Sequence, residues 1–174
     1  SVNQPEALEP LDVLWKSGEI EEAVMPDALE LLGELGDAAI VTDVFQETLS
    51  RAERSLPGVL KVLKALEQSA TKRKVVPEAT ASDIEILLKK GDLESRIAIA
   101  RLSGAWKVKG VVGTLETLVK DLNTDTKLSL AAVEGLVSLD SSESKSALLR
   151  LGGSNQPFST RLRAAAGYAQ SSPK

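Results

Sequence analysis

The sequence of 174 residues contains no cysteine and no histidine, and only 3% of it is aromatic. Without cysteine, the chain has no disulfide, no thiolate nucleophile and no cysteine-ligated zinc or iron–sulfur site. Without histidine, it lacks the commonest metal ligand and the commonest general base, so a zinc enzyme, a histidine-based triad and a histidine-ligated haem are excluded within this chain. No cofactor is predicted.

Long hydrophobic runs are also missing. No stretch approaches the roughly 18 apolar residues of a transmembrane helix, so no membrane span is expected. The N-terminus lacks a basic segment followed by an apolar one, and no secretory signal is predicted. The chain begins and stops without features of natural ends, so we expect a fragment of a longer protein, and the sequence leaves its localisation unknown.

Charge is unevenly distributed along the chain. Residues 1–70 carry 14 acidic and 5 basic side chains, whereas residues 71–174 carry 11 acidic and 16 basic ones. Such asymmetry is consistent with a partner surface or with head-to-tail association. The simpler interpretation is a solvated surface on which the charged residues are unevenly distributed by chance, because surface charge constrains function weakly.

Apolar residues recur at spacings of three and four, the period of an α-helix. One such stripe begins at Val41 and another at Val59, and two more follow from Val111 and Leu128. Alternating patterns typical of strands are scarce. The pattern predicts an all-α protein with helices over about 5–17, 20–35, 37–53, 57–70, 82–90, 92–106, 108–121, 125–139, 142–151 and 158–170.

Several residues mark the expected helix ends. Ser82 and Glu85 have the spacing of a capping box, in which each side chain bonds a free amide at the start of the helix. Asp37, Asp92 and Thr124 are predicted as N-caps. Glycines near the predicted ends are expected where a positive φ is needed; these are Gly18, Gly36, Gly91, Gly110, Gly152 and Gly153.

Three of the predicted helices resemble one another. The segments 94–102, 125–133 and 159–167 each have a polar start, a basic residue, then Ile or Leu, and an alanine four positions after the basic residue. The basic residues are Arg96, Lys127 and Arg161, and the alanines are Ala100, Ala131 and Ala165. Repeats separated by about 30 to 35 residues are typical of helical solenoids.

This pattern resembles the second helix of HEAT-like repeats, most clearly over residues 82–170. The resemblance implies a right-handed α-solenoid, an α-α superhelix of about five helical hairpins. It implies one repeat domain over 1–174, with irregular repeats at 1–70, a loop at 71–81 and regular repeats at 82–174. The three alanines would allow close helix approach. The repeats also look like the HEAT segments of large multidomain bacterial proteins that carry dehydrogenase-like and c-type haem domains elsewhere.

The recurring basic residues Arg96, Lys127 and Arg161 are the candidate binding residues. If they share one face of the stack, they form a basic ladder that receives an acidic segment of a partner. The alternative is a structural ladder that bonds aspartates or helix-end carbonyls of the neighbouring repeat, and the sequence favours this alternative.

Other candidates have a simple structural interpretation. Trp15 and Trp106 are residues of the type found at binding hot spots, but packing at the ends of repeats explains them as well. The basic cluster at 71–74 is interpreted as a solvated loop. The acidic cluster Glu19, Glu21 and Glu22 is interpreted as a solvated helix start, where the helix dipole favours negative charge.

The sequence therefore favours a protein–protein interaction, scaffolding or spacer module of a larger protein, without catalysis of its own. Its partner would be another protein or neighbouring domains of the same chain. No phosphate-binding loop and no nucleophile-elbow motif is present. The alternative is a HEAT-like nucleic-acid glycosylase or a ligand-binding or lyase-type protein. Few aromatic residues accompany the basic C-terminal half, which argues against a nucleic-acid surface.

Overall fold

A computed structural model describes residues 4–171 of the protein, and over this range the chain is all-α, as predicted, with ten α-helices and no strand. The chain divides into two compact units, unit 1 (Ser1–Ala79) and unit 2 (Thr80–Lys174). The boundary between them falls in the segment predicted as a loop. In the part of the chain that is described, no helix is both long and apolar enough to cross a lipid bilayer.

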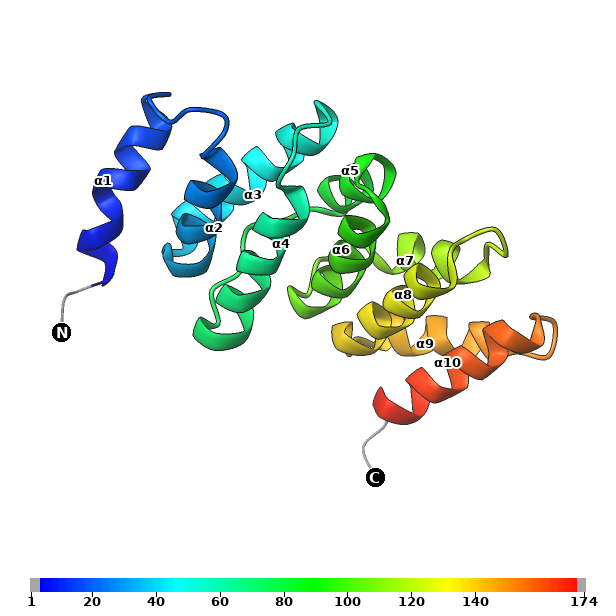
Figure 1. Ribbon diagram of the computed structural model, residues 1–174. Coiled ribbons are helices and arrows are strands. Elements are labelled where there is room, and N and C mark those ends of the chain that lie inside the picture. Colours follow the sequence, from blue (N-terminus) through cyan, green and yellow to red (C-terminus); the bar gives the residue numbers. More distant parts are fainter. Residues whose placement is uncertain (1–3, 172–174) are drawn as a thin grey trace. The chain divides into compact units, whose positions relative to one another are not determined.

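Unit 1 contains four α-helices and a short π-helical turn (Figure 1). These are α1 (Gln4–Lys16), α2 (Met25–Leu35), α3 (Ala38–Glu53), α4 (Val59–Gln68) and η1 (Ser69–Arg73). Each α-helix packs against the next along the chain, and α2 also packs against α4. The predicted stripe of α3 forms the middle of the core, where Val41, Val44 and Phe45 are fully buried.

Helix α2 begins at Met25, five residues later than predicted. Residues 20 and 21 are not helical, and residues 22–24 form a turn. Pro26 explains the difference, because proline is tolerated in the first turn of a helix but removes a hydrogen bond from its interior. A helix that began at residue 20 would have Pro26 in its interior. The predicted N-cap of α3 is confirmed, since the Asp37 carboxylate accepts a hydrogen bond from the Ile40 amide at 3.0 Å.

The segment predicted as a loop at 71–81 is partly helical. Helix α4 continues into the π-helical turn η1, which ends at Lys74 with a φ of 62°. The guanidinium of Arg73 donates hydrogen bonds to the carbonyl oxygens of Glu34 and Gly36, each at 2.8 Å. This contact holds η1 against the end of α2, a long-range interaction that the local sequence does not reveal.

Unit 2 contains six α-helices arranged in two layers. They are α5 (Ala81–Lys90), α6 (Leu93–Ala105), α7 (Val112–Lys120), α8 (Thr126–Leu139), α9 (Ser142–Leu151) and α10 (Phe158–Ser171). In one layer α6 packs against α8 and α8 against α10, and in the other α7 packs against α9 (Figure 1). The consecutive pairs α5 and α6, α7 and α8, α8 and α9, and α9 and α10 also pack together, so α8 contacts helices of both layers.

The closest helix approach in unit 2 is made by glycines. A Cβ atom added at Gly104 would lie 2.1 Å from the carbonyl oxygen of Gly135, and one added at Gly135 would lie 2.3 Å from that of Ala100. Ala100 lies at this close approach, as expected, and Ala131 is fully buried. The expectation is wrong for Ala165, which is exposed because α10 contacts α8 through a different face.

Several predicted helix ends of unit 2 are shifted by one or two residues. The capping box of α5 is formed by Thr80 and Asp83, not by Ser82 and Glu85, because the helix already begins at Ala81. The N-cap of α8 is Asp125 and not Thr124. The predicted N-cap Asp92 is confirmed, with its carboxylate accepting a 2.8 Å hydrogen bond from Ser95.

The glycine prediction is partly correct. Gly18 and Gly110 have positive φ values of 75° and 78°. Gly36 and Gly91 are extended instead, with φ near −64° and −68°. Glycine is still required at Gly36, because a Cβ atom there would lie 2.4 Å from the carbonyl oxygen of Leu32.

Candidate functional site

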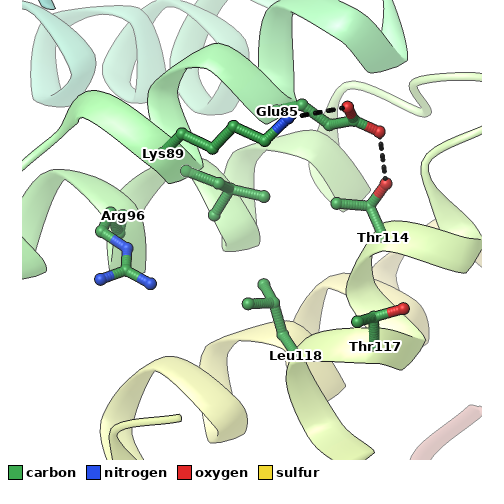
Figure 2. A pocket seen from close by; sticks show the side chains of 7 residues that line it. Glu85, Lys89, Arg96, Thr114, Thr117 and Leu118 are labelled. Atoms are coloured by element: carbon green, nitrogen blue, oxygen red, sulfur yellow. Dashed lines mark hydrogen bonds and ion pairs between the residues drawn. The ribbon is translucent and has the colours of Figure 1, made fainter. Parts of the chain in front are cut away.

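A groove of about 380 Å³ opens on unit 2 between α5 and α7 (Figure 2). We call it the α5–α7 groove. Its lining residues are Glu85, Leu88, Lys89, Arg96, Thr114, Thr117 and Leu118. Arg96, one of the three predicted binding residues, is the only lining residue that comes from α6.

Arg96 is the fourth residue of α6 and is half-buried. Its Nε atom is shielded from solvent and has no hydrogen-bond partner. Among the described residues, no carboxylate lies within ion-pair distance of its guanidinium. A buried donor without a partner is costly, and most such donors in native proteins are satisfied. The groove therefore presents an uncompensated cation.

The carboxylate of the same groove is already engaged. Glu85 accepts a hydrogen bond of 3.1 Å from the Thr114 hydroxyl and forms an ion pair of 3.6 Å with Lys89. Figure 2 shows both contacts on the side of the groove away from Arg96. Because the threonine contact ties α5 to α7, it fixes the rim of the groove while the arginine stays unneutralised.

The remaining walls of the groove are mainly apolar. Leu88 is buried and Leu118 is half-buried, and Thr117 is exposed at the opening. A cation beside aliphatic side chains suits an anionic group on an apolar stem, such as the side chain of a glutamate. This arrangement can bind an anion.

The other two predicted binding residues do not line this groove. Lys127 is the second residue of α8 and is exposed. Arg161 is the fourth residue of α10, with its guanidinium carbon 5.8 Å from the centre of the Phe158 ring. Arg96 and Arg161 therefore occupy corresponding helix positions, and each has a buried Nε without a partner. The corresponding residue of α8 is Ser129.

Ladder-like polar contacts between neighbouring hairpins exist, but other residues form them. Arg101 pairs with Glu134, and Arg163 donates a 3.0 Å hydrogen bond to the Ser129 hydroxyl. Arg150 contacts both carboxylate oxygens of Glu116, at 3.2 and 2.7 Å. The partners are 33 or 34 residues apart, close to the repeat length, and this separation is the signal that the sequence analysis missed.

The contact between α7 and α9 changes the titration of its carboxylate. Glu116 is largely buried. Its hydrogen bonds with Arg150 lower the pKa of the carboxyl most, burial opposes this, and Lys120 adds a smaller lowering effect. The pKa of Glu116 is therefore lower than that of an ordinary glutamate. The same contact raises the pKa of Arg150. The pair therefore stabilises the charged forms of both groups.

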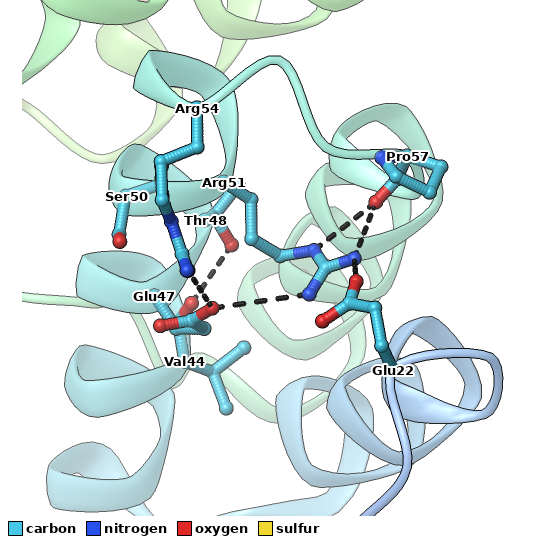
Figure 3. A network of polar contacts seen from close by, with 8 residues as sticks. All are labelled: Glu22, Val44, Glu47, Thr48, Ser50, Arg51, Arg54 and Pro57. Atoms are coloured by element: carbon cyan, nitrogen blue, oxygen red, sulfur yellow. Dashed lines mark hydrogen bonds and ion pairs between the residues drawn. The ribbon is translucent and has the colours of Figure 1, made fainter.

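One member of the acidic cluster Glu19, Glu21 and Glu22 has a structural role that was not predicted. Glu22 forms an ion pair with Arg51, whose side chain is fully buried (Figure 3). The same guanidinium donates through Nε and Nη2 to the carbonyl oxygen of Pro57, at 3.0 and 2.8 Å. The hydrogen bond from Arg51 lowers the pKa of the Glu22 carboxyl. Arg51 lies at the same three-and-four spacing as the buried apolar residues of α3, and this spacing is the signal that predicts its burial.

Two other predicted candidates have structural contacts. Arg73, within the basic cluster at 71–74, bonds the end of α2, and Lys72 forms an ion pair of 3.4 Å with Glu34. All four residues of the cluster are exposed, as the solvated interpretation predicts, but residues 71–73 belong to η1 instead of a loop. Trp106 is buried at the C-cap of α6, consistent with packing, and Trp15 is half-buried in α1.

The described part of the chain contains no group of three or more acidic, cysteine or histidine residues placed to hold a metal ion. Comparison with known proteins found no family model, no curated protein and no solved structure that matches the chain. The geometry of the α5–α7 groove is therefore the main guide to function.

Proposed function

We propose that the chain is a protein-binding segment of a larger scaffold, built as a right-handed, HEAT-like α-solenoid, and that its α5–α7 groove receives an acidic side chain of a partner protein. Arg96 binds the carboxylate, and Leu88 and Leu118 contact its aliphatic stem. The proposal assigns no catalytic step to this segment.

The packing of unit 2 supports the solenoid part of the proposal. Alternate helices α6, α8 and α10 lie side by side in one layer, as stacked hairpins require. Polar contacts between neighbouring hairpins recur at separations of 33 and 34 residues. Each hairpin thus covers an apolar face of the next one.

One observation carries the binding part of the proposal: the Nε atom of Arg96 is buried and has no partner beside an open groove. A guanidinium binds a carboxylate through two parallel hydrogen bonds, and such a contact would satisfy this donor. Binding of an acidic partner thus recovers energy that the free protein lacks, whereas a fully paired arginine would gain little.

The proposal is tested by titrating the chain with a glutamate-rich peptide and following the arginine Nε–H signals by NMR. We expect the Arg96 signal and the methyl signals of Leu88 and Leu118 to shift in a saturable manner. Arg96→Gln should abolish these shifts. Lys127→Gln is the matched control, because it removes one positive charge from the same unit outside the groove and should leave the titration unchanged.

Two results would contradict the proposal. Equal loss of binding in Arg96→Gln and Lys127→Gln would mean that net charge alone attracts the peptide. No saturable shift at any peptide concentration would leave the segment as a spacer between other domains.

A further inference from the structure

Helix α10 has apolar residues on two opposite faces. Thr160, Ala164 and Gly167 are buried against the rest of unit 2. On the outward face, Phe158 is 71% exposed and Leu162, one turn later, is 60% exposed. The outward face of α10 thus has the character of an interface, although no described residue covers it.

Arg161 belongs to the same outward face. It lies three residues after Phe158 and one before Leu162, and its guanidinium stands over the Phe158 ring at 5.8 Å. Its buried Nε has no hydrogen-bond partner, and α10 contains no acidic residue. The outward face therefore combines two large apolar side chains with an unpaired cation.

A groove of opposite charge lies at the start of unit 1. We call it the α1–α2 groove; its volume is about 540 Å³. Five of its lining residues are apolar and three are acidic, and none is basic: Leu11, Glu19, Ile20, Glu21, Val24, Asp27, Ala28 and Leu31. Val24 and Leu31 are among the exposed large hydrophobic residues.

We propose that the α1–α2 groove of one copy of the chain receives α10 of a second copy, so that the protein associates head to tail. Phe158 and Leu162 then occupy the apolar floor, as residues one turn apart do when an amphipathic helix binds a groove. Arg161 pairs with an acidic residue of the rim. Charge complementarity selects this occupant, because the helix carries only positive charge and the groove only negative charge.

Glu21 is the main expected partner of Arg161. Asp27 already pairs with Lys61, and Glu19 accepts a hydrogen bond of 2.9 Å from the Ser17 hydroxyl. The Glu21 side chain is exposed and makes no ion pair with a described residue. A contact between Arg161 and Glu21 therefore breaks no existing ion pair among the described residues.

The two surfaces are different, so the interface is heterologous. Each copy that has bound through α10 still has a free α1–α2 groove, and the reverse is also true. Such contacts build open chains or closed rings rather than a dimer. This association uses neither Arg96 nor the α5–α7 groove, so it is independent of the proposed partner binding.

Sedimentation velocity of the purified 174-residue chain tests the proposal. Between about 5 and about 500 µM, a range suited to small transient interfaces, we expect the average mass to rise continuously with concentration. Raising the salt from about 0.05 to about 0.5 M should weaken the association, because salt screens exposed charge pairs. A chain that stays monomeric throughout this range overturns the proposal.

Charge reversal identifies the two surfaces. Arg161→Glu or Glu21→Lys alone should weaken self-association by at least roughly tenfold, because each change turns attraction into repulsion. An equimolar mixture of the two variants retains one intact α10 and one intact α1–α2 groove. In the mixture the other α10 and the other groove also carry opposite charges, both reversed, so both contacts between unlike copies are attractive. The mixture should therefore regain the association that neither variant shows alone.

Matched variants control for net charge and folding. Lys127→Glu and Glu53→Lys make the same charge changes at exposed positions outside both surfaces, so they should associate like the original chain. Leu162→Ala removes apolar contact from an exposed position and should also weaken association. Association that survives Arg161→Glu and Leu162→Ala contradicts the role of α10, and failure of the mixture to regain association contradicts the pairing of Arg161 with Glu21.

Discussion

The helix ends of the two units are stabilised by different kinds of contact. In unit 2, the helices α5, α6, α8 and α9 each begin with a side-chain N-cap, provided by Thr80, Asp92, Asp125 and Ser141. In unit 1, α3 is capped by Asp37, whereas α2 and α4 have no side-chain cap. Local side chains thus define most helix starts in unit 2 but not in unit 1.

Long arginine side chains provide much of the corresponding support in unit 1. Arg51 reaches the carbonyl oxygen of Pro57 in the turn before α4, and Arg73 reaches two carbonyl oxygens at the end of α2. In the described part of unit 2, Lys107 has a comparable role: its ammonium donates to the Leu139 carbonyl at 3.1 Å and also to the Ser138 carbonyl. Unit 1 therefore depends more on contacts between distant segments, and its helix ends are harder to read from the sequence.

Helix spacing in unit 2 gives the largest effect we expect. Gly104→Ala should lower the free energy of unfolding by about 3 kcal/mol, because its Cβ atom meets the backbone of Gly135, which cannot move aside as a side chain can. This cost outweighs the gain of about 1 kcal/mol in helix propensity. Urea unfolding followed by the fluorescence of Trp106, which lies in the same unit, measures the change.

Gly113→Ala is the matched control for this substitution. Gly113 lies in α7, and no atom lies within 4 Å of the Cβ position. The variant should be as stable as the original chain or slightly more stable. Equal destabilisation by both variants would mean that alanine itself, rather than the approach of α6 to α8, is responsible.

In unit 1 the largest expected effect comes from Arg51→Met. The substitution keeps an unbranched apolar side chain but removes the hydrogen bonds to Pro57 and the ion pair with Glu22. Because charge-assisted bonds are lost, we expect a decrease of about 2 kcal/mol in stability. Fluorescence of Trp15 and hydrogen exchange of residues 54–59 should report this loss.

Arg54→Met serves as the comparison for Arg51→Met. Arg54 lies three residues later and is exposed, with an ion pair of 3.1 Å to Glu47. Exposed pairs contribute little, so the loss should stay below about 1 kcal/mol. If the two variants are equally stable, the buried guanidinium does not support unit 1 as proposed.

The contrast between the units explains which parts of the fold were predictable. Helical spacing identified all ten helices, and short caps such as Asp37 and Asp92 were correctly recognised from a few neighbouring residues. The start of α2 and the turn η1 were not, because Pro26 and the contact from Arg73 decide them. The cap of α5 lies two residues earlier than predicted, at Thr80, since serine, threonine and aspartate can all cap a helix and several of them occur near this helix start.

The candidate site was only partly predictable for a similar reason. The repeat pattern identified Arg96, which lines the α5–α7 groove. It aligned Arg161 with Lys127, whereas the helix starts align Arg161 with Ser129. Sequence similarity of the short segments does not determine how the three helices align, because this alignment depends on the residue at which each helix begins. Which arginine pairs with which carboxylate depends on the packing of neighbouring hairpins.

A smaller effect concerns the pH dependence of unit 2. Arg150 lowers the pKa of Glu116 in the folded protein below its ordinary value of 4.5. The ionised Glu116 therefore contributes its full stabilisation of the fold above pH 4.5, and this stabilisation is lost as the pH falls through the pKa of the folded protein. Glu116→Gln should cost about 1 kcal/mol at pH 7 and reduce the loss of stability on acidification. Urea unfolding at pH 7 and in the acid range measures both. An unchanged acid dependence would contradict the role of this pair.

The smallest effect tests how unit 2 begins. Thr80→Ala removes the hydroxyl that accepts the Asp83 amide, but this bond is 3.3 Å long and the reciprocal bond from the Thr80 amide to Asp83, at 2.8 Å, remains. We therefore expect a loss of about 0.5 kcal/mol, at the low end for an N-cap. Ser82→Ala, inside the first turn, should cost nothing measurable. Urea unfolding monitored by Trp106 separates the two, and a larger loss for Ser82→Ala would mean that α5 begins later, as the sequence pattern alone predicts.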